Sequence, residues 1–503
     1  MEWYVATLIL FLLAGVVVII RDLPWHNKNV VTSRTFLIIT SLGIGVLNLL
    51  ALSNGAVAQQ ILATLLLGFS VYPMWRYLRR GEVGIPFVPL TAIIYGVFYG
   101  LPALLPFEVF RPYCGVSSES LMKTQILVAI GLLVVLFAFY KFPKKIWRDL
   151  LPQVSMEWSE LKAKYLAVVL GVFGIIANVI FQVIEVPMAL GAIITFCRLW
   201  SLIAIAIFFL LRLRGRLPLM SNLFLWLVLI PLQIFVDIGG GSVFPILRLG
   251  MMLLMLYLLV RRNLPYRWIL IGVPILFLLL GTKGEFRKVT WGEGRTMTGN
   301  PIEKGMFFFQ VTSSFISSGG PDTIYSAYET ALQRFDLLTL FSYIVDETPV
   351  RVPYWGGETY QMLFWMWIPR FLYPDKPVED QGQNFGHRYA ILHSNDLTTS
   401  WNIPQLVEMY ANFGMLGVVF GMFLIGLTYQ GLHHILNHPR AGSWGMVSSA
   451  VILSNLMNID SNFTVVYGNT IYYIMLLYLL GLFVRQRAPV MDPCSLSILA
   501  PNQ

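Results

Sequence analysis

Arginine recurs along one polar segment, residues 283–405, the only long stretch without enough continuous apolar sequence to cross a bilayer. The candidate ligands there are Arg287, Arg334, Arg351, Arg370, Lys376 and Arg388. A guanidinium group binds phosphate through a planar pair of donors, so clustered arginines suit a diphosphate headgroup. The alternative for each cation is an ordinary ion pair with one of the carboxylates of this segment.

Two further arginines lie inside apolar stretches. Arg198 and Arg248 each fall in the half of an expected span that is nearer to the polar segment. An arginine within a membrane costs several kcal/mol unless it meets water or an anion. We therefore expect both side chains to face one polar cavity that opens towards the segment. The alternative is that each side chain reaches the interface by itself.

Polar residues occur on the neighbouring spans at spacings that place them on common faces. The groups are Asn178, Gln182 and Glu185; Gln233 and Asp237; and Asn455, Asn458, Asp460 and Asn462. They could line the same cavity, or they could simply form hydrogen bonds between helices, which is the common use of such residues in membrane bundles.

Transfer of a glycosyl or phosphoryl group to a hydroxyl needs a base within hydrogen-bond reach. Glu408 is the first candidate because it opens an apolar span directly after the polar segment; its alternative role is to interact with the dipole of that helix. The other candidates are Asp346, Glu347, Glu358 and His387. HExxH, GxxxxGK[ST], GxSxG and CxxC motifs are absent, so we expect neither a metal nor a cofactor.

The elements that must position these residues are membrane helices. Hydrophobic residues make up 57% of the 503 residues and charged residues 12%, whereas soluble proteins average about 25% charged. A span needs about 20 apolar residues, and this length predicts about thirteen spans. They centre on residues 3–20, 35–53, 57–77, 85–106, 121–141, 165–184, 190–211, 219–237, 243–260, 267–281, 407–429, 444–459 and 468–484.

Clusters of Lys and Arg, such as Arg79 with Arg80 and Arg212 with Arg214, fall on one side of these spans in every case. That side is predicted to be cytoplasmic. The net charge of +9 therefore reports orientation and does not indicate nucleic-acid binding. The N-terminus and the polar segment are expected on the outer, periplasmic face, and the C-terminus in the cytoplasm.

The predicted fold is thus an all-α, polytopic inner-membrane bundle with one large, partly helical periplasmic loop. Its parts are spans one to ten (1–281), the loop (282–406), spans eleven to thirteen (407–487) and a cytoplasmic tail (488–503). Periodicity predicts a helix over 326–345 with Arg334 and Asp336 in its middle, a short interfacial helix over 359–368 and an amphipathic cytoplasmic helix over 147–164.

Short motifs follow one another in order along the loop. They are Arg334-Phe335-Asp336, Gly356-Gly357, IPRFLYPDKP (368–377), TSWNIP (399–404) and EMYANFGMLG (408–417). This series resembles the outer loop of Wzy-type O-antigen or repeat-unit polysaccharide polymerases over about residues 280–421. Members of that family often carry two long outer loops, whereas one is evident here.

The resemblance implies a glycosyltransferase that joins undecaprenyl-diphosphate-linked oligosaccharides on the periplasmic face and releases undecaprenyl diphosphate. By that analogy Arg334 and Arg370, with Arg198 and Arg248, hold the donor diphosphate, and Glu408 orients or deprotonates the acceptor hydroxyl. Trp401 and Asn402 join the substrate-binding set with the remaining loop cations. The implied partners are the lipid-linked glycan and membrane lipid, and a polysaccharide chain-length regulator is a further candidate.

Two alternatives stay open. An O-antigen ligase or another integral-membrane glycosyltransferase would share this architecture and differ in its acceptor. A flippase or transporter of lipid-linked sugars belongs to a different class; transporters usually contain inverted repeats with broken helices at the midplane. The sequence has no visible internal repeat, which favours an enzyme with its site at one face.

We expect Arg370→Ala to abolish long-chain polysaccharide while the protein remains in the membrane, because the variant loses a bidentate phosphate ligand. Gel analysis of surface glycan length, with a membrane immunoblot as the control for protein level, would measure this. Normal chain lengths in the variant would remove Arg370 from the site.

Overall fold

The computed structural model describes most of the chain, and within this part all regular structure is helical, with a single β-bridge between Trp158 and Arg485. The described residues are 28–51, 57–82, 84–105, 116–151, 153, 155–183, 191–239, 244–291, 301–318, 329–366, 368, 372–373, 375–377, 380–397 and 399–486. The all-α bundle predicted from composition is confirmed over these ranges.

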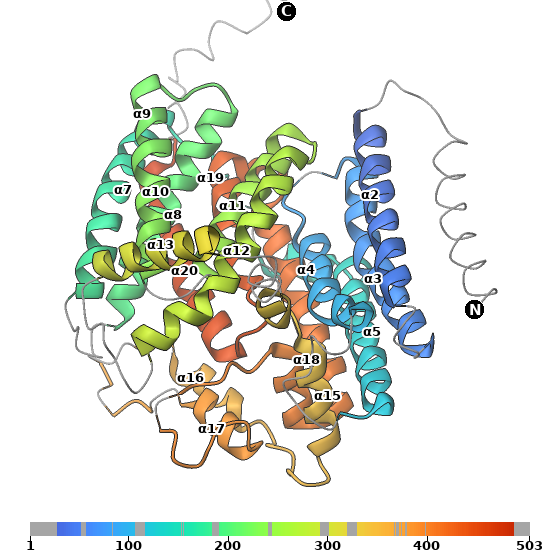
Figure 1. Ribbon diagram of the computed structural model, residues 1–503. Helices are drawn as coiled ribbons and strands as arrows, with labels where there is room; N and C mark the ends of the chain where they lie inside the picture. Colours follow the sequence, from blue (N-terminus) through green and yellow to red (C-terminus); the bar gives the residue numbers. More distant parts are fainter. Residues whose placement is uncertain are drawn as a thin grey trace, which may run out of the picture.

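Long helices run roughly parallel and antiparallel to one another in the bundle (Figure 1). They are α2 (Lys28–Leu50), α3 (Val57–Arg80), α4 (Phe87–Tyr95), α5 (Ser118–Lys141), α7 (Glu160–Val183), α8 (Gly191–Leu213), α10 (Ile230–Gly239), α11 (Phe244–Arg261), α12 (Tyr266–Trp291), α18 (Gln405–Leu436), α19 (Gly442–Leu456) and α20 (Phe463–Val484). Two of them include π turns: α4 continues through Gly96–Gly100, and α9 (Leu219–Leu223) leads through Phe224–Leu229 into α10.

Nine helical stretches within the described ranges are long and apolar enough to cross a membrane. They lie in α2, α3, α4 with its continuation, α5, α7, α9 with α10, α11, α18 and α20. Of the other expected spans, 3–20 lies outside the described residues. The span expected over 190–211 corresponds to α8, which is described from Gly191 onwards, 267–281 lies in α12, and 444–459 corresponds to the 15-residue α19. The count of thirteen and the orientation stay predictions.

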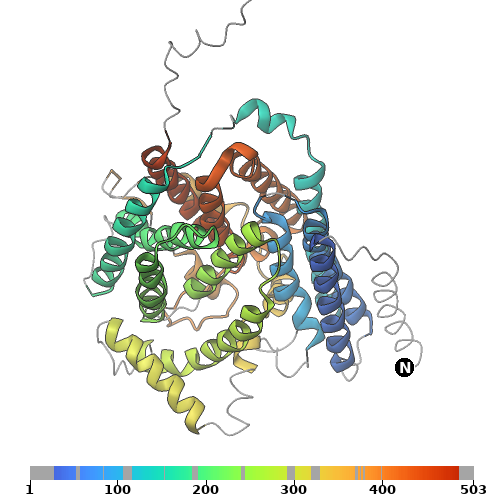
Figure 2. The same ribbon diagram turned by 90° about the horizontal axis from the view of Figure 1, so that it is seen from above.

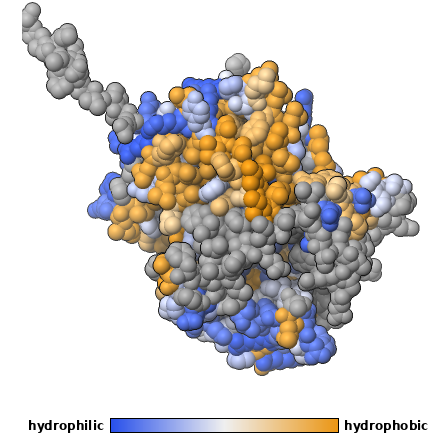
Figure 3. Space-filling model, turned by 90° about the vertical axis from the view of Figure 1, so that its left-hand side faces the viewer, coloured by the Kyte–Doolittle hydropathy of each residue, from blue (hydrophilic) through white to orange (hydrophobic). Residues whose placement is uncertain are grey.

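The connections that carry the basic clusters lie together at one end of the bundle. Three hydrogen bonds join them: Arg262 to the Glu82 carbonyl, Arg214 to Ser443, and Met156 to the Arg440 carbonyl. The short helices α15 (Leu337–Glu347), α16 (Met362–Met366) and α17 (Gln381–Arg388) cover the opposite end (Figure 1). Between the two ends the face in Figure 3 carries an apolar band, which suits contact with lipid chains.

Two of the helix predictions made from periodicity are wrong. The helix expected over 326–345 is interrupted, because Arg334 and Phe335 form a turn and Asp336 caps the N-terminus of α15. The helix expected over 147–164 is replaced by the six-residue α6 (Lys145–Leu150), a non-helical stretch and the start of α7 at Glu160. The element expected over 359–368 consists of a 3₁₀ turn, Glu358–Tyr360, followed by α16.

Helix α18 is broken near its beginning, where Phe413 and Gly414 leave helical geometry. The loop before α16 uses this break, because the backbone N–H groups of Trp355 and Gly356 donate to the carbonyls of Ala411 and Asn412 at 3.0 and 3.2 Å. The first two turns of α18 are therefore attached to the loop as well as packed in the apolar core.

Gly414→Ala should destabilise the fold by about 1–3 kcal/mol, because φ of +62° disfavours a side chain and a Cβ would lie 2.7 Å from the Tyr354 hydroxyl. Denaturant unfolding in detergent micelles measures this. The matched control is Gly250→Ala in α11, where a Cβ meets nothing within 4 Å. This substitution should stabilise the fold by about 0.5–1 kcal/mol. Equal effects at both positions would contradict the assigned strain.

Candidate functional site

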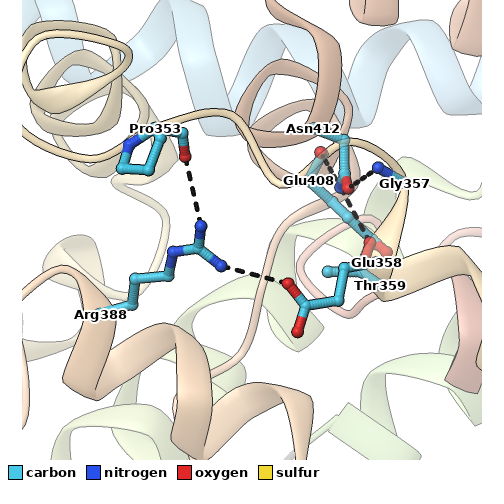
Figure 4. Close-up of polar contacts among 7 residues, drawn as sticks. All are labelled: Pro353, Gly357, Glu358, Thr359, Arg388, Glu408 and Asn412. Carbon is cyan, nitrogen blue, oxygen red and sulfur yellow. Dashed lines mark hydrogen bonds and ion pairs between the residues drawn. The ribbon is translucent and has the colours of Figure 1, made fainter.

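A buried hydrogen-bond network joins the loop to α18 (Figure 4). The Asn412 amide donates to the Thr359 hydroxyl and to the Glu408 carbonyl, both at 2.8 Å, and its oxygen accepts from the Gly357 N–H at 2.9 Å. The amide of Gln381 in α17 donates to the Thr359 carbonyl at 2.6 Å. Because these groups are buried and satisfied, they fix the loop rigidly on the bundle.

Glu408, the predicted base, is completely buried within this network. Its Oε2 accepts a 2.7 Å hydrogen bond from the backbone N–H of Phe463, the first residue of α20, beside the N-cap Asn462. A carboxylate at a helix N-terminus stabilises that end of the helix. The observed contact therefore corresponds to the structural alternative considered from the sequence, with the difference that the stabilised helix is α20.

Three of the predicted loop cations bind protein groups. Arg388 donates to Glu358 at 3.2 Å (Figure 4) and lies over the Trp355 ring at 4.6 Å. Lys376 donates to the carbonyls of residues 366 and 368 at 2.9 and 3.0 Å, so its ammonium group stabilises the chain around α16. Arg351, which is mostly exposed, pairs at 2.7 Å with the carboxylate four residues before it. Within the described residues, these three contacts involve neither of the two arginine clusters described next.

Arg334 lies beside a carboxylate that is distant in sequence, Asp460, in the connection between α19 and α20. Burial raises the pKa of the Asp460 carboxyl, while the nearby Lys283 and Arg334 lower it. Burial also lowers the pKa of the Arg334 guanidinium, and Asp460 opposes that shift. Arg334 is exposed and Asp460 is half-buried, so both side chains keep accessible surface.

Arg198 in α8 and Arg248 in α11 both lie within electrostatic range of one carboxylate, Asp237 near the end of α10. Each arginine interacts electrostatically with Asp237, and the two also repel one another. Arg248 donates to the Tyr473 hydroxyl of α20 at 2.8 Å. The two arginines thus lie near one another, whereas the shared cavity expected from the sequence stays a prediction; the described part of this cluster holds two cations and one anion.

A series of hydrogen bonds between amide and hydroxyl side chains ends at Asp237. Asn178 donates to Ser201 at 3.1 Å, Ser201 donates to Gln233 at 2.5 Å, and Gln233 donates to Asp237 at 3.0 Å. The polar residues of three spans therefore both form interhelical hydrogen bonds and lead to the arginine cluster.

Several predicted residues cannot be placed in this arrangement. Arg370 and Glu185 lie outside the described residues, and the side chains of Arg287 and Gln182 are likewise not described. The Trp401 side chain is half-buried, and the backbone N–H of this residue donates to the Gly382 carbonyl of α17. Asn402 is exposed. Across the described ranges, no three His, Cys, Asp or Glu side chains gather as metal ligands.

Sequence reasoning missed Lys283, Tyr473, Thr359, Gln381 and Asn412 as members of these clusters. Lys283 stands directly after an expected span, and Asn412 lies one helical turn after Glu408, so both carried a local signal. Thr359, Gln381 and Tyr473 carried none, because each acts through a partner at least 20 residues away.

Fold and clusters together define a polytopic, all-α membrane protein. One end of its bundle is covered by the loop and carries the two arginine–carboxylate clusters. A family model described as a domain of unknown function, DUF8712, matches residues 149–488, which is more than half of the chain. The protein belongs to this family. No curated protein and no solved structure matches the chain.

Asp336, at the start of α15, should make the stability of the fold depend on pH. Burial raises the pKa of its carboxyl from 3.8 to about 6, although Oδ1 accepts a 2.9 Å hydrogen bond from the Thr339 N–H. Between these values the native state keeps a proton that the unfolded chain has released, so the free energy of unfolding falls as pH rises, by up to about 3 kcal/mol.

Thermal unfolding in detergent between pH 4 and pH 7 would measure this fall, which should be complete soon after pH passes 6. Asp336→Asn keeps a capping oxygen and loses the titrating group, so this part of the pH dependence should disappear. An unchanged pH dependence in Asp336→Asn would assign it to other groups.

Proposed function

We propose that the protein is an integral-membrane glycosyltransferase that polymerises undecaprenyl-diphosphate-linked oligosaccharides at the periplasmic face of a bacterial inner membrane. The single observation that carries this proposal is the Arg198–Asp237–Arg248 cluster. Two guanidinium groups share one described carboxylate among apolar helices, and such an excess of positive charge is stabilised by an anion.

A diphosphate is the anion that fits this setting best. It would be anchored at the right depth by a lipid tail, and it gathers negative charge as it leaves the sugar. Fixed guanidinium groups in an environment of low polarity stabilise such a charge in the transition state. Arg334 and Lys283, which both interact electrostatically with Asp460, supply a second basic group at the same end of the bundle.

The acceptor hydroxyl would be oriented by a carboxylate near these cations. Asp460 fits this role better than Glu408, because Asp460 lies beside Arg334 and keeps accessible surface, whereas Glu408 is fully buried against α20. We propose Glu408 as a positioning residue: it holds the start of α20, and with it the adjoining connection that carries Asp460.

The proposal predicts a loss of activity in Arg198→Gln and Arg248→Gln. Removing one transition-state donor typically costs about 2.7–4 kcal/mol, so glycan elongation should fall about 10²–10³-fold. The length distribution of polysaccharide made by membranes that hold equal amounts of protein measures this. Arg351→Gln is the matched control, since that arginine is exposed and pairs with Glu347.

A binding assay separates this function from its alternatives. Native mass spectrometry of the purified protein with undecaprenyl diphosphate should show binding that both Gln variants weaken at least tenfold and Arg→Lys variants weaken less. Unchanged binding and unchanged glycan length in both Gln variants would reject the proposal. Transfer to a lipid A core acceptor, with no elongation of lipid-linked units, would identify a ligase.

A further inference from the structure

Helix α13 (Pro301–Ser318) is oriented differently from the bundle helices. It crosses in front of them at a steep angle (Figure 1), and the view from above places it at the edge of the molecule (Figure 2). Its 18 residues lie within the segment that the sequence assigns to an aqueous loop. It packs against α10 and α12, and more lightly against α7.

One face of α13 holds it on these helices. Gly305, Phe308 and Thr312 are spaced as neighbours on one helix face, and all three are buried. The Thr312 hydroxyl donates to Thr282 of α12 at 3.3 Å, and Gly305 leaves room for the Phe235 ring, which a Cβ would approach to 2.9 Å. Glycine is therefore needed where α13 crosses α10.

The outward surface of α13 is divided lengthwise. Phe309 and Ile316 are seven residues apart on one flank, with 48% and 60% of their surface exposed. Glu303 and Ser314 are exposed on the other flank, about 140° around the helix at 100° per residue. An amphipathic helix with this division suits the boundary between lipid chains and water.

We propose that α13 lies in the plane of the membrane at the loop-side interface, with Phe309 and Ile316 among the acyl chains and Glu303 and Ser314 in the headgroup layer. The lipid bilayer is the partner that fits. Phe309 stacks on Phe235 of α10 at 6.1 Å, and the stretch Leu219–Ile238 is long and apolar enough to cross the membrane. The exposed apolar flank is therefore continuous with the surface of a helix suited to lipid contact.

In this position α13 would lie between the surrounding lipid and the parts of α10 and α12 that carry Asp237 and Lys283. Phe235 precedes Asp237 by two residues, and Thr282 directly precedes Lys283. If the proposed function holds, a lipid-linked donor approaching from this side passes α13 before it meets Arg198 and Arg248. The placement of α13 in the interface does not itself depend on that function.

Spin labelling in phosphatidylcholine vesicles tests the placement. In a full-length background with Cys114, Cys197 and Cys494 replaced by alanine, single cysteines are introduced as Phe309→Cys, Ile316→Cys, Glu303→Cys and Ser314→Cys. Labels at 309 and 316 should collide with dissolved oxygen at least threefold more, relative to a water-soluble nickel chelate, than labels at 303 and 314.

Equal accessibility of all four labels to the nickel chelate would overturn the proposal and place α13 in water. Melting temperatures check that each variant folds. Because Phe309 packs on Phe235 and Ile316 is the more exposed of the two, Ile316→Cys carries the test if Phe309→Cys is unstable. The readout requires no enzymatic activity, so failure of the proposed function would leave its result unchanged.

Discussion

The arrangement of the covered end depends on how the backbone is satisfied where α18 breaks. Phe413 and Gly414 leave helical geometry, and the carbonyls of Ala411 and Asn412 accept from the loop instead. A buried backbone group without a hydrogen bond is costly, so the loop and the break stabilise one another. The Asn412 side chain strengthens the same junction through Thr359. The loop is thereby held as a fixed cover on the first turns of α18, whose Leu406 and Val407 are buried in the core of the bundle.

A second constraint is the placement of charge at this end. Asp237 accepts from Gln233 and interacts electrostatically with Arg198 and Arg248, while Asp460 interacts in the same way with Lys283 and Arg334. In each cluster a carboxylate reduces the repulsion of two cations without cancelling their charge. Placing arginines within apolar helices is costly, and intramembrane charges are commonly found where a protein handles an ion or a charged substrate. The two clusters are built by different helices, yet both lie at the end that the loop covers.

The apolar chemistry explains the rest of the architecture. Large hydrophobic side chains remain exposed on the outer faces of the bundle, among them Phe173, Leu227 and Leu270. In water such a surface would drive aggregation, whereas in lipid it is the expected solvent-facing surface. Helix α13 follows the same rule in a different orientation, with one flank apolar and the other polar.

The sequence by itself determined that the chain is suited to a lipid bilayer and that its fold is all-α. Runs of apolar residues with few charges require backbone groups to be satisfied within each segment, which only helices can do here, and the depth of Arg198 and Arg248 follows from counting along a helix. Tertiary structure decided which groups meet. Glu408 accepts a hydrogen bond from the N–H of Phe463, 55 positions away, and Arg334 interacts electrostatically with Asp460. Lys376 donates to a backbone carbonyl ten residues before it. Periodicity reports only neighbours on one element, so it could not reveal these pairings. It also failed over 326–345, where the Asp336 side chain competes for the backbone and starts a new helix.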